Sequence, residues 1–306
     1  SRSKRDVKGP KIASRATPGS TRGHLGVASG RLWGDLGVTL GGQREVRGVR
    51  GGSGEAAGGR FFFFALGFYL FSLYTKQNLV IGRNNLVEAN FSGVLFHGFY
   101  LGGVFFSISI GMPTGIAALI VTLQPILTNL LSGPSLGEKI TLRQWLGVLF
   151  GFFGAVLVLG FDIGSGVPLF GLISTIIALL AITSSTIWQK KLSNNLPLSV
   201  SNFYQAIGGC LFHILIIIFF TKPYIDFNKT FILSMSHQIF LVSFGAFTIL
   251  MFLIKKNSAS RTVSIFFLIP PVSALMAWFF LNENLTNIDI LGFLIASIGV
   301  YMATKN

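Results

Sequence analysis

Apolar stretches long enough to cross a membrane follow one another from residue 61 to the end of the sequence. A bilayer-spanning helix needs roughly 20 mainly apolar residues. A soluble bundle of amphipathic helices is excluded, because these stretches have no polar face to meet water. The sequence therefore predicts an all-α integral membrane protein with about nine spans: 61–74, 93–110, 113–132, 145–160, 169–188, 200–220, 239–254, 262–281 and 289–303. The first stretch is short, so an earlier start of its helix stays open.

The sparse polar chemistry of the chain excludes several function classes. Charged residues make up 11% of the 306 residues, against about 25% in an average soluble domain. Cys210 is the single cysteine, which leaves no internal disulfide and no cysteine cluster for a metal. The four histidines form no ligand pair, and no GxxxxGK[ST] loop for ATP is present. We expect no metal, no cofactor and no enzymatic activity.

The composition changes abruptly near residue 60. Residues 1–60 hold 12 Lys/Arg, 4 Asp/Glu and 15 Gly, and none of the 31 Phe. Such a basic, glycine-rich tail is expected to be disordered. It is a product of a wrong reading frame or chimeric coding region, a targeting segment, or a genuine extension; the abrupt change favours the first.

The basic residues of the remaining chain fall mostly on one side of the predicted spans. If the spans alternate in direction, ten Lys/Arg lie on the side of the C-terminus, and only Lys222 and Lys229 lie on the other. This positive-inside pattern predicts a cytoplasmic C-terminus. The cationic loops are therefore interpreted as topology signals in a lipid bilayer, and no nucleic-acid partner is expected.

An internal repeat links two parts of the sequence 145 residues apart. The spacing Pro-x12-Glu-x8-Gly-x6-Gly occurs twice without a gap, with these pairs: Pro125 and Pro270, Glu138 and Glu283, Thr141 and Thr286, Gly147 and Gly292, Gly154 and Gly299. Four matching spacings indicate duplication. The repeat unit spans five helices, and an odd number inverts the second copy in the membrane. The predicted units are residues 61–160 and 166–306.

The repeated prolines and glutamates are candidates for hinges or gates. Pro125 and Pro270 each interrupt a helix in the middle of the membrane, beside an expected central cavity, although a static kink explains them too. Glu138 and Glu283 precede "TLRQ" and "TNID", in which Thr141 and Thr286 are predicted N-caps. Helix-end electrostatics or loop pairing is the simplest role of these glutamates, and gating or proton coupling is the alternative.

Glycine patterns at the ends of the two repeats predict close helix packing. Gly147 and Gly151 form GxxxG, with Gly154 nearby. Gly292 and Ala296 repeat the pattern weakly, and Gly299 is the repeat equivalent of Gly154. These faces are expected to pack inside the protein, or alternatively against a second subunit of a homodimer.

Both repeat ends resemble a known family. "AALIVTLQPILTNLLSGPSLGEKITLRQWLGVLFGFFGAVLVLG" and "SIFFLIPPVSALMAWFFLNENLTNIDILGFLIASIGVYMA" are similar to the ends of two EamA domains, and the resemblance covers about 60–306. It implies the drug/metabolite transporter (DMT) superfamily, with ten helices in two inverted five-helix halves. The partner of span 169–188 should lie near 24–43, which is too polar and glycine-rich to span a membrane. The first transmembrane helix is therefore expected to be missing or replaced.

The resemblance also places a substrate cavity between the third, fourth, sixth, eighth and ninth helices of the family. The polar and aromatic residues that fall there are His97, Tyr100, Gln124, Asn129, Trp188, Ser243, Thr248 and Ser273. Amides and hydroxyls can read a carboxylate or an amine, and an aromatic ring can cover a cation. Hydrogen bonding between helices is the competing interpretation for each of them.

These features predict a secondary transporter that moves a small neutral, zwitterionic or amphipathic metabolite, such as an amino acid, by alternating access. The predicted spans hold no Lys or Arg, and no Asp or Glu before Asp289, which argues against a highly charged substrate. A coupling proton or the substrate gradient would supply the drive, and a bacterial inner membrane is the expected location. The alternatives are an inactive or scaffold membrane protein from a truncated transporter gene and, less favoured, a membrane-embedded lipid enzyme.

Overall fold

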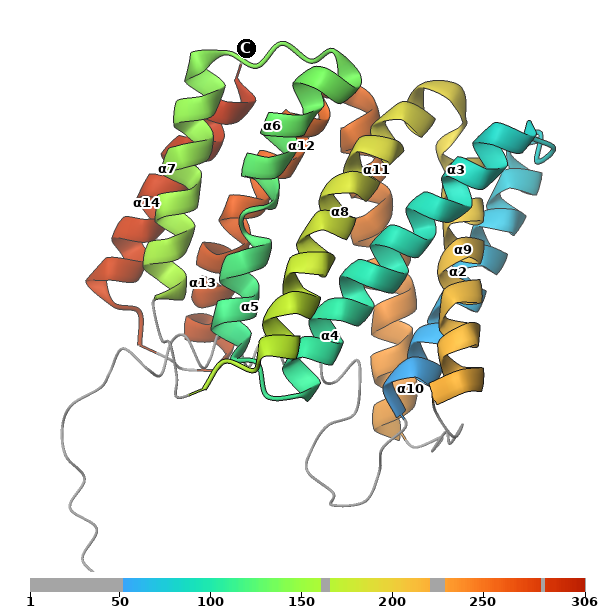
Figure 1. Cartoon of the computed structure of the whole chain (residues 1–306), viewed down its shortest axis with the longest axis horizontal. Helices are drawn as coiled ribbons and strands as arrows, with labels where there is room; N and C mark the ends of the chain where they lie inside the picture. The colour runs from blue at the N-terminus through green and yellow to red at the C-terminus, as the bar shows by residue number, and fades with distance from the viewer. Residues whose placement is uncertain (1–51, 161–165, 221–228, 282–283, 306) are drawn as a thin grey trace, which may run out of the picture.

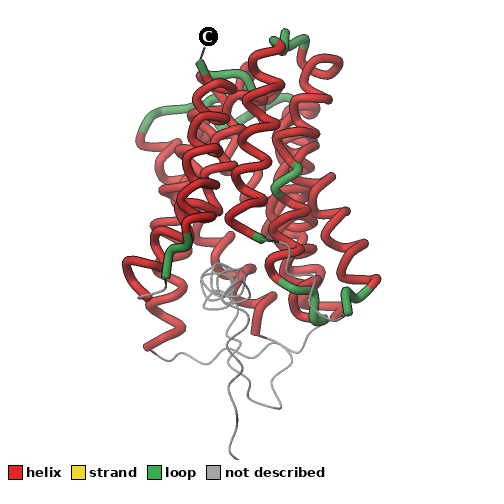
Figure 2. Tube along the Cα trace, turned by 90° about the vertical axis from the view of Figure 1, so that its left-hand side faces the viewer, coloured by secondary structure: helices red, strands yellow, loops and turns green. Residues whose placement is uncertain are grey.

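The computed structural model describes residues 52–160, 166–220, 229–281 and 284–305, and this part of the chain is a bundle of helices without a strand (Figures 1 and 2). Eight helical stretches are long and apolar enough to cross a membrane, and the shorter Arg60–Tyr74 is apolar as well. All nine predicted spans are therefore helical. The first half contains α2 (Gly52–Tyr74), α3 (Arg83–Gly93), η1 (Val94–Tyr100), α4 (Leu101–Ser109), α5 (Thr114–Val121), α6 (Gln124–Leu136) and α7 (Leu142–Leu159). The second half contains α8 (Leu169–Asn195), α9 (Leu198–Phe220), α10 (Lys229–His237), η2 (Gln238–Phe247), α11 (Thr248–Lys256), α12 (Ala259–Ser264), η3 (Ile265–Leu268), α13 (Ile269–Leu281) and α14 (Asn287–Thr304).

The helix boundaries follow the predicted repeat. A shift of 145 residues carries 114–136 onto 259–281 and 142–159 onto 287–304 without any offset. The same shift carries α2 onto α9 and the stretch 83–109 onto 229–256 to within two residues. The fold is thus two inverted-topology repeats, as expected. The partner of α8 falls within residues 24–50, which lie outside the described residues, as does the predicted position of the first helix at 24–43.

The two repeats also share their irregularities. Two π-helical segments, η1 and η2, interrupt equivalent helices. Each helix that carries a repeated proline is broken just before it, at Thr122 and Leu123 in one repeat and at the 3₁₀ segment η3 in the other. Pro125 and Pro270 are each the second residue of the helix that follows the break. Proline has no amide hydrogen to donate and is tolerated near a helix N-terminus, so the break lies where the sequence allows it.

Local signals in the sequence explain several helix ends. Gly137 ends α6 with a left-handed φ of 69°, which glycine adopts without strain. Thr141 and Gln144 form a capping box at the start of α7, and Thr286 and Asp289 form its equivalent at α14. Both predicted N-caps are confirmed.

The inverted arrangement is visible where α7 and α14 pack against each other, at the left of Figure 1. Gly147 lies beside Ala303, whereas Gly154 lies beside Ala296, so the two helices run antiparallel. Elsewhere, aromatic side chains from α2 and η2 fill the centre of a second group of helices, where Phe61, Phe64 and Phe247 are buried.

One end of the bundle carries the C-terminus, and we call it the C-terminal face (top of Figure 1). The loops between α2 and α3, between α6 and α7 and between α8 and α9 also lie there, together with the turn between α11 and α12. The ten basic residues of the predicted cytoplasmic side lie in these connections, in the adjoining helix ends and next to the C-terminus.

Candidate functional site

Two predicted site residues lie on the two π-helical segments, halfway along their helices, and are linked through residues of α2. His97 lies on η1 and Ser243 lies on η2. Ser243 is one residue away from the position that the repeat makes equivalent to His97. A residue that the sequence analysis missed joins them: the Arg60 side chain donates from Nε to Ser243 Oγ over 2.8 Å. Arg60 also lies over the ring of Phe61, at 5.0 Å. Phe61 in turn contacts His97, with 4.6 Å between ring centroids.

Arg60 corrects the expectation that the spans hold no Lys or Arg. Helix α2 begins at Gly52, so the last residues of the predicted tail 1–60 continue the apolar helix. Ser243 lies midway along the helical stretch 229–256, which places the guanidinium deep between the ends of the bundle. The sequence signal was present as an arginine directly before "FFFF", but the assumed start of the span assigned it to the tail.

His97 is enclosed by rings. Its side chain is 1% exposed, and neither ring nitrogen has a hydrogen-bond partner among the described residues. The rings of Phe64, Phe96 and Phe247 lie within 6.0 Å of the imidazole, centroid to centroid. Phe61 also contacts His213, with 5.0 Å between ring centroids, and His213 Nδ1 is hydrogen-bonded to the Gly209 carbonyl. A buried imidazole with unused nitrogens can accept or donate a proton once a polar group reaches it.

Two further predicted residues take part in contacts between α8 and its neighbouring helices. Gln124 donates from Nε2 to Thr186 Oγ1 at 3.1 Å and links the start of α6 to α8. Trp188 packs edge-on against Phe91, with 5.3 Å between ring centroids. These contacts are hydrogen bonding and packing between helices.

The remaining polar candidates are spread over several helices. Asn129 on α6 is 2% exposed, and neither atom of its amide has a partner among the described residues. Thr248 Oγ1, at the start of α11, is buried without a described partner as well. Ser273 on α13 is buried and partnered, and Tyr100 packs on Phe96 at 5.5 Å. Of the predicted site residues, the structure therefore links His97 with Ser243 through Arg60 and Phe61, and His97 with Tyr100 through Phe96.

Glu138 reaches across to the other repeat. Its carboxylate accepts hydrogen bonds from the backbone of Ala259 (2.7 Å) and Ser260 (3.3 Å) and from the Ser260 hydroxyl (2.7 Å), at the first turn of α12. Its repeat equivalent, Glu283, lies outside the described residues.

The predicted packing glycines lie where α7 and α14 touch. A Cβ atom on Gly147 would meet the Ala303 nitrogen at 2.5 Å, and one on Gly154 would meet the Gly292 carbonyl oxygen at 2.6 Å. Gly151 faces both Gly299 and the ring of Phe267. The glycine faces thus pack against each other across the two repeats.

A buried polar network between α3, α8 and α9 was also missed. Ser185 Oγ bonds Ser92, Gln189 Nε2 bonds Ser185 Oγ (3.1 Å) and Gln205 Oε1 (3.3 Å), and Gln205 Nε2 bonds Ser201 Oγ (3.0 Å). Glutamines inside apolar stretches are the signal that could have pointed to it. Gln189 lies one residue beyond the predicted end of its span, which explains the omission.

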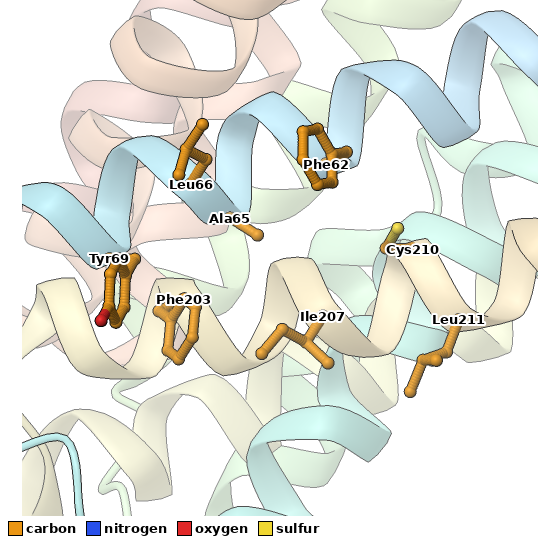
Figure 3. A pocket seen from close by; sticks show the side chains of 8 residues that line it. All are labelled: Phe62, Ala65, Leu66, Tyr69, Phe203, Ile207, Cys210 and Leu211. Atoms are coloured by element: carbon orange, nitrogen blue, oxygen red, sulfur yellow. The ribbon is translucent and has the colours of Figure 1, made fainter.

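A groove of about 320 Å³ runs along the outside of the bundle between α2 and α9 (Figure 3). Phe62 and Leu211 on its walls are more than half exposed. Its lining is apolar and contains none of the predicted site residues: Phe62, Ala65, Leu66, Tyr69, Phe203, Ile207, Cys210 and Leu211. The groove therefore belongs to the lipid-facing surface.

Comparison with known proteins shows which family the sequence belongs to. The EamA-like transporter family matches the sequence twice, over residues 46–160 and 169–305. The chain belongs to this family. A solved crystal structure shares the fold, with a TM-score of 0.70 at 17% identity over 92% of this chain and 96% of the other.

Curated relatives are transporters by name. "Uncharacterized transporter YvbV" of Bacillus subtilis (strain 168) is 26% identical over 66% of this chain and 65% of the relative, just under two thirds of its length. "Probable amino-acid metabolite efflux pump" of Escherichia coli (strain K12) is 23% identical over 65% of this chain and 70% of the relative. With its apolar helices, the chain is a multi-pass integral membrane protein of the EamA-like transporter family, and the names of its relatives point away from an enzymatic activity.

Proposed function

We propose that this protein exports a small zwitterionic metabolite, such as an amino acid, across the cell membrane by alternating access. The observation that carries the proposal is the repeat of helix irregularities. The π-helical segments and the breaks before Pro125 and Pro270 recur in both repeats. Discontinuous helices at the interface of inverted repeats are the usual frame of a central transport site.

The symmetry supplies a mechanism. Each repeat can adopt the conformation that the other one leaves, so outward-open and inward-open states have similar energies. The broken helices α5–α6 and α12–α13 supply the flexible points, because the free backbone groups at each break allow a bend. A proton or the substrate gradient drives the cycle.

The cluster around Arg60 supports the proposed substrate class. A guanidinium inside a membrane is costly unless an anionic or polar group meets it. The three carboxylates whose side chains the structure describes lie elsewhere: Glu88 on α3, Glu138 in the α6–α7 loop and Asp289 at the start of α14. In the proposal a substrate carboxylate binds Arg60, and the neighbouring Ser243 and His97 supply polar contacts. Two relatives named as amino-acid metabolite efflux pumps favour amino acids and the export direction.

A transport assay tests the proposal. The purified full chain is reconstituted in liposomes loaded with a mixture of labelled amino acids, and efflux is followed against protein-free liposomes. The expected result is saturable efflux of at least one amino acid, competed by the unlabelled compound and not by the matching amine that lacks a carboxylate. Correct insertion with no efflux and no binding would instead support a scaffold protein.

A further inference from the structure

Charged side chains hold both ends of the turn between α11 and α12 at the C-terminal face. α11 ends at Lys256 and α12 begins at Ala259, so two residues connect them. Helix ends leave backbone groups unpaired, with carbonyls at the C-terminus and amides at the N-terminus. Here an ammonium meets the carbonyls, and a carboxylate meets the amides.

The carbonyl end is held by Lys190 of α8. Its Nζ donates to the main-chain oxygens of Ile254 (2.9 Å), Lys255 (3.3 Å) and Asn257 (2.7 Å). The amide end is held by Glu138, through the backbone and hydroxyl contacts to Ala259 and Ser260 described above. A cation at a helix C-terminus and an anion at a helix N-terminus both match the helix dipole. Charge-assisted hydrogen bonds of this kind are among the stronger ones in proteins.

Glu138 and Lys190 both lie on elements that pack with the first repeat, whereas the turn belongs to the second. Glu138 belongs to the loop after α6, in the first repeat. α8 follows the first repeat in the chain but packs mainly against the helices of that repeat, from α3 to α6. The turn they hold belongs to the second repeat. Glu138 therefore ties the turn of the second repeat directly to the first repeat. Lys190 ties the same turn to α8, which packs mainly against the first repeat.

The equivalent turn at the opposite face differs. There α4 ends at Ser109 and α5 begins at Thr114, after Pro113, and the N-cap position of α5 has no side-chain hydrogen bond among the described residues. Proline at this position offers no hydroxyl, whereas its equivalent Ser258 caps α12 by accepting from the Arg261 amide. The repeat equivalents of Glu138 and Lys190 are Glu283 and Glu45, and both lie outside the described residues.

We propose that Glu138 and Lys190 form a latch that keeps the C-terminal face closed and must release when the protein opens there. This inference rests on the proposed alternating-access function, because alternating access requires the repeats to part at one face at a time. The bonds of the latch join the parts that would separate. Their strength then sets how often this face opens, and loss of either charge shifts the population toward the open state.

The test measures opening directly, without transport. Ser132 on α6 is fully buried, lies one turn from the end of the helix at the C-terminal face, and is isosteric with cysteine. In a Cys210→Ser background, Ser132→Cys is introduced, the protein is placed in nanodiscs, and the rate of labelling by a membrane-impermeant maleimide is measured. Glu138→Gln and Lys190→Gln are each expected to raise that rate about tenfold or more, since a hydrogen bond to a charged group is worth at least a factor of ten. Ser260→Ala, which removes one bond of the latch, is expected to give a smaller rise.

Matched variants separate the latch from a general effect of charge. Lys139→Gln removes a cation from the same loop, and Glu88→Gln removes an acid from α3. Among the described residues the turn is bonded by Lys190 and Glu138 and not by these two side chains, so both variants should label at the parent rate. Helicity by circular dichroism and a single size-exclusion peak show that each variant is folded. Equal labelling of Glu138→Gln and the controls overturns the latch, whatever the transport assay gives. Faster labelling without transport of any compound keeps the latch and rejects the proposed function.

Discussion

The close contact between α7 and α14 predicts how much one added methyl group, in Gly147→Ala, lowers the free energy of unfolding. In Gly147→Ala, the new Cβ would lie 2.5 Å from the Ala303 nitrogen and 2.6 Å from the Gly299 carbonyl oxygen. Ordinary contact begins at 3.4 Å, so the helices must part by about 0.9 Å. These are backbone atoms, which cannot turn aside as a flexible side chain can.

The cost follows from that separation. A radial gap of about 0.5–1 Å forfeits a quarter to a half of each dispersion contact, and overpacking typically costs about 1–3 kcal/mol. We take about 3 kcal/mol, because backbone meets backbone along the whole crossing. Alanine regains about 1 kcal/mol over glycine within a helix. The net loss in the free energy of unfolding is therefore about 2 kcal/mol.

Gly115→Ala is the matched control. Gly115 lies in α5, and a Cβ there would have no heavy atom within 4 Å. This variant should gain up to about 1 kcal/mol from helix propensity alone, so the two variants should differ by about 3 kcal/mol. The measurement is equilibrium unfolding by SDS in mixed micelles, followed by circular dichroism. Equal stability of the two variants would refute the packing argument.

Three further predictions concern other parts of the structure. Thr141→Ala and Thr286→Ala each remove an N-cap and should lower stability by about 1 kcal/mol in the same unfolding assay, and a loss at only one site would contradict the equivalence of the two boxes. Pro270→Ala restores an amide hydrogen at the break before α13 and should slow efflux while leaving substrate binding intact; an unchanged rate assigns the proline to a static kink. Arg60→Gln should weaken binding of a carboxylate substrate about tenfold or more, with Arg60→Lys retaining part of the affinity; equal affinity of all three proteins would remove Arg60 from the site.

The spans and the repeat could be predicted because their signals lie in the order of residues along the chain. Apolar length gave the helices, and the matched spacing of Pro125 and Pro270 gave the 145-residue shift that the helix boundaries follow. Thr141 was identifiable as a cap because its partner Gln144 is three residues away. Contacts between residues within one helical turn of each other can be predicted from the sequence in this way.

The rest depends on contacts between distant residues. Glu138 binds residues more than 120 positions away, and nothing near it in the sequence indicates that partner. Gln189 and Gln205 meet only after α8 and α9 fold back on each other. The π-helical segments carry no distinctive local sequence, since "VLFHGFY" and "QIFLVSFGAF" look like ordinary apolar helix. Arg60 was misplaced because hydropathy set the start of α2 several residues too late.

The glycine contact between α7 and α14 has a consequence for biosynthesis. Gly147 meets Ala303, which follows it by more than 150 residues, so α7 is inserted long before its partner exists. At about 5–20 residues per second, the ribosome needs roughly 8–30 s to supply α14. During that interval a bare glycine face is open to any other nascent helix with small residues. Newly made protein should therefore depend on an insertase or chaperone that shields α7 until the last helix arrives.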